Sequence, residues 1–286
     1  MPVFPDPRTE NLRLALLQTA PVLRDEEANR QRIATLLRGH AADLAVTPEL
    51  SLTGYDVRDA AASLAKSEWP RFDLPCPTLL GAIESANAGI PYNVALLAEA
   101  QSARVVHRKL YLPTYGMFDE GRYFGRADRL QCFSINDWRI GVLICEDFWH
   151  PALSYVLAMQ GIHLLVVMAA APGRGALVGG EAGAFFASTD AWERIARTTA
   201  QLYGIYVVLC NRVGVEGGVT FAGESLAVAP NASVVARAGV EEQRIDVTLS
   251  RHELARARRP YAHLRDDDPR VIVAELQRIA AVNATA

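Results

Sequence analysis

Three residues in this sequence have side chains that together can break an amide bond. Glu49, Lys109 and Cys145 each lie at the end of a short apolar stretch that predicts a strand. A thiol attacks a carbonyl only as its thiolate, so a nearby carboxylate must accept the thiol proton. The tetrahedral intermediate then carries a negative oxygen, which an ammonium group and a backbone N–H can stabilise. Placed at one edge of a sheet, the three residues would form a nucleophilic site.

The stretch 139–151, RIGVLICEDFWHP, defines the setting of Cys145. Its β-branched first half predicts a buried strand, and Pro151 predicts the start of a helix. Cys145 then lies where a strand gives way to a turn, which is where α/β proteins bind ligands. Glu146 and Asp147 favour a functional site here, because buried carboxylates are costly without compensating partners.

Each of the three residues also has a simpler interpretation. A free cysteine after an apolar strand is commonly a small buried hydrophobe. Glu49 could cap a turn, and Lys109 could be a solvated strand end. Position alone therefore leaves both interpretations open.

Composition limits the classes of function. The chain has 286 residues, half of them hydrophobic, and a net charge of −3. We find no basic block for nucleic acid, no apolar run of about 18 residues for a membrane helix, and no signal-peptide pattern in 1–13. The four cysteines and six histidines are dispersed, without CxxC or HExxH. We therefore predict no metal, no disulfide scaffold, no nucleic-acid or membrane partner, and a cytoplasmic location.

Alternating patterns along the chain predict a layered, mixed-sheet α/β fold. The whole chain, 1–286, is predicted to be one domain with a core at about 12–248 and a helical tail at 252–286. Helices are predicted at 25–39, 77–88, after Pro151, at 189–203 and 270–282. Strands are predicted at 12–18, 43–47, 92–99, 104–109, 130–135, 138–144, 163–168, 205–210, 225–229, 233–236 and 243–247. The glycine-rich segment 169–183 lacks phosphate-loop spacing, so we interpret it as a mobile pocket loop.

Longer motifs surround the same residues: TPELSLTGYDVRD around Glu49, HRKLYLPTYGMFDEGRYF around Lys109, GVLICEDFWHP around Cys145, and the later YVVLCNRVGVEGGVTFAGES. Together they resemble the carbon–nitrogen hydrolase, or nitrilase, superfamily. They occur in the family's order and span about 12–247. The resemblance implies a four-layer α-β-β-α sandwich, assembled as a homodimer or a higher homo-oligomer.

The same resemblance implies roles for individual residues. Glu49 would be the general base, Lys109 the oxyanion stabiliser and Cys145 the nucleophile. Glu120 matches a fourth pocket acid that orients the lysine and the substrate amine. The backbone N–H of Glu146 would be the second oxyanion donor. The implied reaction proceeds through an acyl-thioester and requires no metal or organic cofactor.

The implied substrate is a small molecule. Within the superfamily, KLYLPTYGMFDEGRYF and CEDFW most resemble free-standing amidases and the glutaminase domain of glutamine-dependent NAD synthetases. We favour an independent amidase acting on a small linear amide or N-carbamoyl compound. The alternatives are a glutaminase-type subunit that supplies ammonia to a partner, and a catalytically silent binding protein of the same fold.

Specificity depends on loop residues that sequence does not fix. Tyr55, Tyr115, Phe118, Glu146 and Trp149 are predicted to bind substrate, although each aromatic ring is equally well explained as a core or rim residue. The same holds for Phe221. Arg174 and Arg212 could hold a substrate carboxylate, and for Arg212 we favour a structural role. One departure from the family pattern, ARTTAQLYG before Tyr206, affects packing or dimer contacts there.

Overall fold

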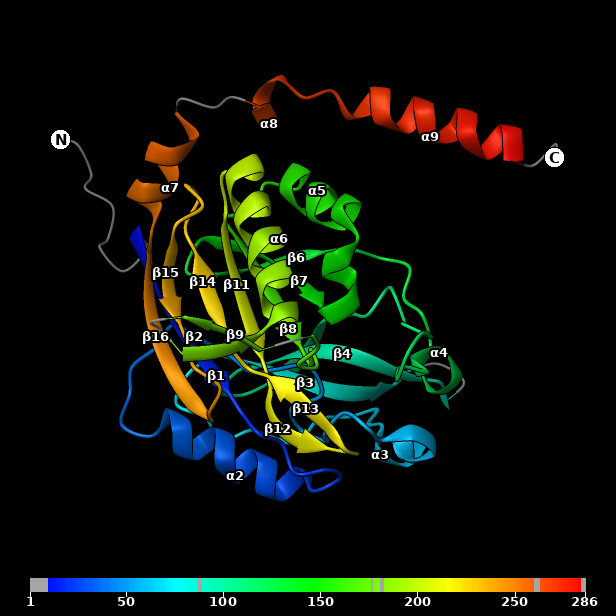
Figure 1. Ribbon diagram of the computed structural model, residues 1–286, viewed down its shortest axis with the longest axis vertical. Coiled ribbons are helices and arrows are strands. Elements are labelled where there is room, and N and C mark those ends of the chain that lie inside the picture. The colour runs from blue at the N-terminus through cyan, green and yellow to red at the C-terminus, as the bar shows by residue number, and fades with distance from the viewer. Residues whose placement is uncertain (1–9, 87–88, 176, 181–182, 260–262, 284–286) are drawn as a thin grey trace.

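The computed structural model describes residues 10–86, 89–175, 177–180, 183–259 and 263–283. Within these residues two six-stranded mixed sheets face each other (Figure 1). In spatial order the first sheet contains β16 (Gln243–Ser250), β1 (Asn11–Gln18), β2 (Leu44–Val46), β3 (Thr78–Ser85), β4 (Pro91–Ala98) and β5 (Ala103–Arg108). The second contains β15 (Val234–Arg237), β14 (Leu226–Val228), β11 (Tyr206–Asn211), β8 (Leu164–Ala169), β7 (Trp138–Ile144) and β6 (Cys132–Ile135).

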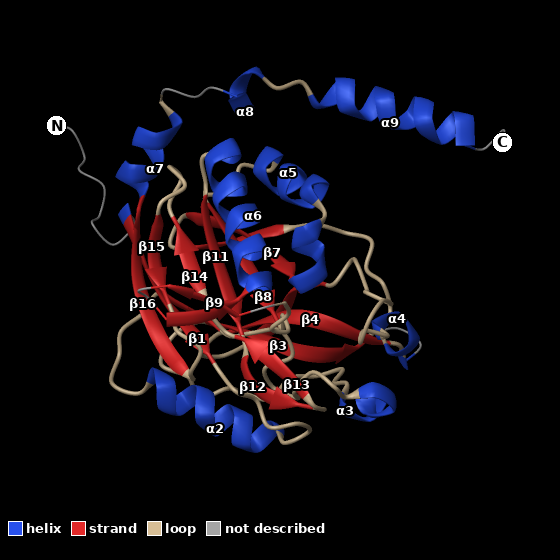
Figure 2. Cartoon of the chain, viewed as in Figure 1, coloured by secondary structure: helices blue, strands red, loops and turns tan. Residues whose placement is uncertain are grey.

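Helices cover the outer face of each sheet (Figure 2). The helix α2 (Glu26–Leu37) lies outside the first sheet, whereas α5 (Pro151–Met159) and α6 (Ala187–Tyr203) lie outside the second. Shorter helices are η1 (Arg58–Ala60), α3 (Ala61–Leu64), α4 (Glu120–Tyr123) and the 3₁₀ helix η3 (Cys145–Trp149). The predicted four-layer α-β-β-α sandwich is confirmed.

The alternation of β1 explains why the layers pack as they do. Leu14 and Leu16 point into the core between the sheets, whereas Ala15 and Leu17 pack in a second core with Ile33 of α2. Because all of these side chains are almost fully buried, each leucine contributes about 1.5–3 kcal/mol of hydrophobic free energy. The sandwich thus fixes the strand ends that carry the candidate residues.

The helix predicted at 77–88 is wrong. Thr78–Ser85 is the strand β3, hydrogen-bonded between β2 and β4, and residues 87–88 lie outside the described residues. Leu79 faces the inter-sheet core, and Leu80 faces the α2 side. A strand buried on both faces shows no apolar–polar alternation, so its sequence does not distinguish it from a short buried helix.

Two glycine-rich segments contain strands that sequence did not predict. Segment 169–183 contains β9 (Leu177–Gly180), which pairs with β10 (Gly183–Phe186), and residues 176 and 181–182 lie outside the described residues. The loop after β11 contains a hairpin of β12 (Val213–Glu216) and β13 (Val219–Ala222). Both segments are irregular only in part, and the mobility of the first remains a prediction.

The C-terminal region is helical, as predicted. It contains α7 (Arg251–Arg258), α8 (His263–Asp266) and α9 (Pro269–Asn283), and α9 extends away from the sandwich (Figure 1). Among the described residues, no helix is long and apolar enough to cross a membrane. The prediction that residues 1–13 hold no signal peptide stays a prediction, because residues 1–9 lie outside the described residues. The single-domain division, the homo-oligomer and the cytoplasmic location stay predictions.

Candidate active site

The three residues singled out by sequence come together from both sheets. Glu49 follows β2 and Lys109 follows β5 in the first sheet, whereas Cys145 follows β7 in the second. The prediction of a single sheet edge is therefore wrong, because the pocket is formed where strand ends of two facing sheets meet. Glu49 and Lys109 both act electrostatically on the Cys145 thiol.

Lys109 is the centre of a buried charge cluster. Its Nζ lies 2.7 Å from Oε1 of Glu49 and 2.8 Å from each carboxylate oxygen of Glu120. The side chains of Lys109 and Glu49 are fully buried. Burial would lower the Lys109 pKa, but Glu120 and Glu49 hold that pKa well above its usual value. Lys109 is therefore a buried ammonium ion.

Glu49 is held in one orientation by neutral donors as well. Asn93 Nδ2 donates to Oε1 over 2.8 Å, and the backbone N–H of Ala170 donates to Oε2 over 3.1 Å. Sequence analysis missed both residues. Asn93 interrupts the apolar run PYNVALLA of β4, and a buried amide in such a strand is a usable signal, whereas the Ala170 backbone gives none.

The turn that carries Glu49 rests directly on Gly81 of β3. A Cβ at Gly81 would lie 2.3 Å from both Leu50 N and Pro48 O, so any larger residue would displace the turn. Gly81→Ala should destabilise the protein by about 3 kcal/mol, because neither backbone can move aside. Urea unfolding would measure this effect.

Gly218→Ala is the matched control for Gly81→Ala. Its Cβ would meet open space, so only its left-handed backbone, with φ of +79°, opposes the change. We expect a loss of about 1 kcal/mol at Gly218. Equal losses at the two glycines would contradict the close packing of β3 against the Glu49 turn.

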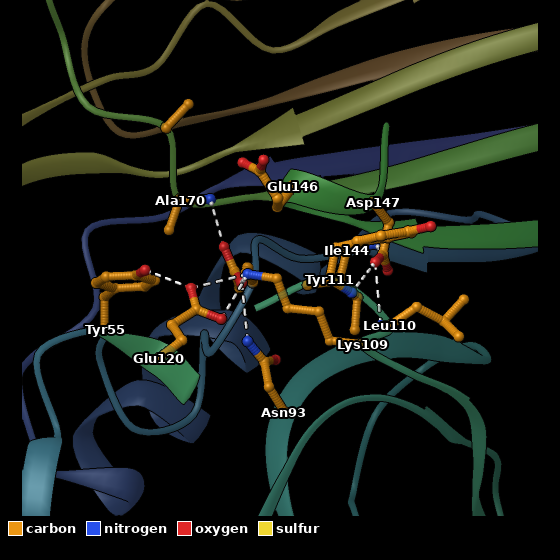
Figure 3. Close-up of polar contacts among 12 residues, drawn as sticks. Tyr55, Asn93, Lys109, Leu110, Tyr111, Glu120, Ile144, Glu146, Asp147 and Ala170 are labelled. Carbon is orange, nitrogen blue, oxygen red and sulfur yellow. Dashed lines mark hydrogen bonds and ion pairs between the residues drawn. The ribbon is translucent and has the colours of Figure 1, made fainter. Parts of the chain in front are cut away.

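Glu120 is the first residue of α4 and faces the same pocket. The Tyr55 hydroxyl donates a short hydrogen bond to its Oε1 (Figure 3). Burial raises the pKa of Glu120 to about 7, with Glu49 adding to the rise and Lys109 opposing it. The structure thus places Glu120 and Tyr55 beside Lys109, where the family resemblance puts the fourth acid.

Cys145 is the first residue of η3, on a strained turn directly after β7. Its φ is +47°, a left-handed conformation that non-glycine residues rarely adopt. Burial and the charge of Glu49 raise the pKa of the thiol well above its usual value, although Lys109 and the Ala170 N–H act in the opposite direction. The resting thiol is therefore protonated and needs a base before it can attack.

Other predicted residues contact Tyr55 or act electrostatically on Cys145. The Tyr115 hydroxyl donates to Oε2 of Glu146 over 2.7 Å, and burial together with this contact raises the Tyr115 pKa to about 12. The Phe118 ring packs edge-on against Tyr55 and Tyr115, with ring centroids 6.1 and 5.7 Å apart. Arg174 lies over the Phe118 ring at 5.1 Å.

Trp149 packs against the outer helical layer. Its ring packs edge-on against Trp192 of α6 at 5.3 Å, and 42% of its surface is exposed. Its predicted contact with substrate has no support from these contacts, because Trp192 belongs to the outer helical layer.

Arg212 has the structural role that sequence analysis favoured. It is buried, donates to Oε2 of Glu216 over 3.1 Å and lies over the Phe221 ring at 4.0 Å. Oε1 of Glu216 accepts the backbone N–H groups of Tyr55 and Asp56 over 2.8 and 2.7 Å. Arg212 thus helps to hold the loop that carries Tyr55. In the described part of the chain, no group of three or more His, Cys, Asp and Glu residues could hold a metal ion.

Comparisons with known proteins give a consistent result. The sequence profile described as carbon–nitrogen hydrolase matches residues 13–259. A glutamine-dependent NAD(+) synthetase from Thermotoga maritima is 31% identical over 85% of this chain, which spans only 43% of that protein. An (R)-stereoselective amidase from a Pseudomonas species is 28% identical over 89% of this chain and 91% of its own length.

A solved structure shows the same fold. It is a mutant of the amidase from Nesterenkonia sp. AN1, with the acetamide moiety of fluoroacetamide covalently added at its active-site cysteine. The TM-score is 0.74 at 22% identity, and the match covers 95% of this chain and 98% of the amidase chain. At that identity the similarity establishes the fold alone.

Proposed function

The chain belongs to the carbon–nitrogen hydrolase family, and from this premise we propose that it hydrolyses a small linear amide or N-carbamoyl compound through a cysteine-bound acyl intermediate. One observation carries the proposal: the buried Lys109 ammonium lies between Glu49 and Glu120, within electrostatic reach of the protonated Cys145 thiol. A cluster of this kind is costly in a core and useful in catalysis.

The proposed reaction begins with proton transfer. Glu49 accepts the thiol proton, and the Cys145 thiolate attacks the amide carbon to form a carbon–sulfur bond. The negative oxygen of the intermediate is stabilised by Lys109 and by the Glu146 backbone N–H. As the carbon–nitrogen bond breaks, Glu49 returns the proton to the leaving amine or ammonia.

Hydrolysis of the thioester completes the cycle. Glu49 accepts a proton from a water molecule, which attacks the acyl carbon and expels the Cys145 sulfur. The sulfur regains its proton from Glu49, and the acid leaves. In this scheme Glu120 orients the Lys109 ammonium and accepts a hydrogen bond from the substrate amine, while Tyr55, Tyr115, Phe118 and the Glu146 side chain contact the rest of the substrate.

A second candidate is a glutaminase that supplies ammonia to a separate partner. It is favoured by the 31% identity to a glutamine-dependent NAD(+) synthetase, less than half of whose length this chain spans. The two candidates differ in their response to a partner. Glutamine hydrolysis that rises when a synthetase is added supports the second, whereas partner-independent turnover of other amides supports the first.

We expect brief iodoacetamide treatment at neutral pH to label Cys145 first and almost exclusively. The reason is that Cys145 has a base and a cation beside it, both buried, whereas buried Cys76 has only the partly exposed Asp43 and Arg244, and no charged group among the described residues acts on buried Cys210. Intact-protein mass spectrometry of wild type, Cys145→Ser and Glu49→Gln would measure this. Labelling should disappear in Cys145→Ser and slow in Glu49→Gln.

A panel of amides assayed for ammonia release would then identify the substrate. If Cys145 reacts no faster than Cys132, which is partly exposed, the thiol is not activated. That outcome would contradict the hydrolase proposal and support a binding protein that kept the fold.

A further inference from the structure

The carboxylate of Asp147 accepts hydrogen bonds from four N–H groups. Oδ1 accepts from the backbone N–H groups of Leu110 and Tyr111 over 3.0 and 2.8 Å (Figure 3). Oδ2 accepts from Nε2 of His107 over 2.8 Å and from the backbone N–H of Ile144 over 3.1 Å. The Asp147 side chain is fully buried, and four donors fill the acceptor positions of a carboxylate.

These donors flank two of the residues to which the proposed function assigns chemistry. His107 and Leu110 lie on either side of Lys109, at the end of β5 in the first sheet. Ile144 precedes Cys145, at the end of β7 in the second sheet. One buried carboxylate therefore joins the two strand ends that carry the cation and the thiol, although the strands belong to different sheets.

The turn at Cys145 needs such support. A non-glycine residue with φ of +47° keeps that conformation only where its surroundings enforce it. The bond from Ile144 N–H to Asp147 closes this turn across Cys145 itself. Because the same carboxylate also holds Leu110 and Tyr111, any shift of the Cys145 turn is transmitted to the Lys109 segment.

We propose that Asp147 is a positioning residue, which sets the separation between the Lys109 ammonium and the Cys145 sulfur. This proposal rests on the proposed function, in which that pair carries the reaction. The simpler role of Asp147, capping the short helix η3, would affect stability alone. The two roles are distinguished by the reactivity of the thiol in folded protein.

His107 provides a graded test of the same contact. Its side chain is buried, and Nε2 must carry the hydrogen because Asp147 accepts it. Nδ1 is buried and has no hydrogen-bond partner among the described residues. Within that part of the chain, the ring nitrogens of His107 therefore make their hydrogen bond to Asp147. His107→Gln can still donate to Asp147, whereas His107→Leu cannot.

The experiment measures the iodoacetamide labelling rate of Cys145 across a pH series, using intact mass, for wild type, Asp147→Asn, His107→Leu and His107→Gln. The charged groups that act on the thiol are Glu49, Glu120 and Lys109; Lys109 favours the thiolate, as does the backbone N–H of Ala170. In Asp147→Asn the amide NH₂ must face at least one N–H donor, so the Cys145 turn and the Lys109 segment separate. The labelling profile should then move to higher pH, with roughly tenfold slower labelling at neutral pH.

Turnover of an amide identified in the panel gives the second readout. We expect kcat to fall about 100-fold in Asp147→Asn with little change in KM, because a displacement of about 1 Å has an effect of that size. His107→Leu should show a smaller loss, and His107→Gln should restore most of it. Asp43→Asn is the control. Asp43 also accepts a hydrogen bond from a backbone N–H, that of Arg13 in β1, and its substitution should change only the melting temperature.

Two results would overturn the inference. One is an Asp147→Asn protein that melts earlier but labels and turns over as wild type does. If that variant does not fold, identical profiles for His107→Leu, His107→Gln and wild type would overturn it instead. Failure of the proposed function is separate, since wild-type Cys145 itself would then show no rapid labelling.

Discussion

Cys145→Ala should reduce amide turnover by at least about 10⁴-fold while leaving the fold intact. The loss is large because no other nucleophile is available to form the acyl intermediate once the sulfur is removed. The fold should survive because the side chain is small and because the turn at Cys145 is held by hydrogen bonds to its neighbours, among them Ile144 N–H to Asp147. Ammonia release and a thermal melt would measure the two effects.

Cys132→Ser is the matched control for Cys145→Ala. Cys132 is partly exposed on β6 and contacts Arg139, away from the charge cluster. Its replacement should leave turnover at the wild-type level. Residual turnover in Cys145→Ala within a factor of about ten of wild type would show that the thiol is not the nucleophile, because removing a true nucleophile has a far larger effect.

The sequence was most informative where chemistry-bearing residues end apolar strands. The types and order of Glu49, Lys109 and Cys145 offered a common pocket as one interpretation, which the family resemblance then favoured, and Pro151 correctly predicted the start of α5. The fold class followed from alternating helical and strand patterns together with the family resemblance. Each of these predictions depends on local residue types, which the sequence states directly.

The sequence was least informative where tertiary contacts determine the outcome. Thr78–Ser85 was predicted as a helix because burial on both faces removes the alternation of a strand. Contacts of Glu49 with Asn93 and of Asp147 with His107 join residues about 40 positions apart. The first pairing arises when strands of one sheet assemble and the second only when the two sheets pack, so a pattern along one chain does not reveal them.

The charge balance of the pocket links stability to chemistry. Two carboxylates, Glu49 and Glu120, share one ammonium, and burial raises the pKa of Glu120 to about 7. Lys109 therefore has two separable functions: it compensates buried negative charge in the resting protein, and it is proposed to stabilise the oxyanion. Replacing Lys109 alone removes both at once, so a second substitution is needed to separate them.

Lys109→Met should destabilise the protein by about 3–5 kcal/mol near neutral pH, because Glu49 and Glu120 remain buried without a cation. Lys109 opposes the rise in the Glu120 pKa, so without it burial and the charge of Glu49 raise the folded-state pKa of Glu120 still further above its unfolded value. The folded state then binds more protons than the unfolded state, so stability should fall as pH rises from about 5 to 8. Urea unfolding across this range measures the effect.

Adding Glu120→Gln to Lys109→Met should recover stability but not activity. The amide removes one buried carboxylate and its repulsion of Glu49, so the free energy of unfolding near neutral pH should rise by about 1–3 kcal/mol over Lys109→Met alone. Turnover should stay at least about 10³-fold below wild type in both variants, because neither has the cation that faces the oxyanion. Recovery of turnover together with stability would contradict the proposed role, since Lys109 would then act only as the counter-ion of Glu49 and Glu120.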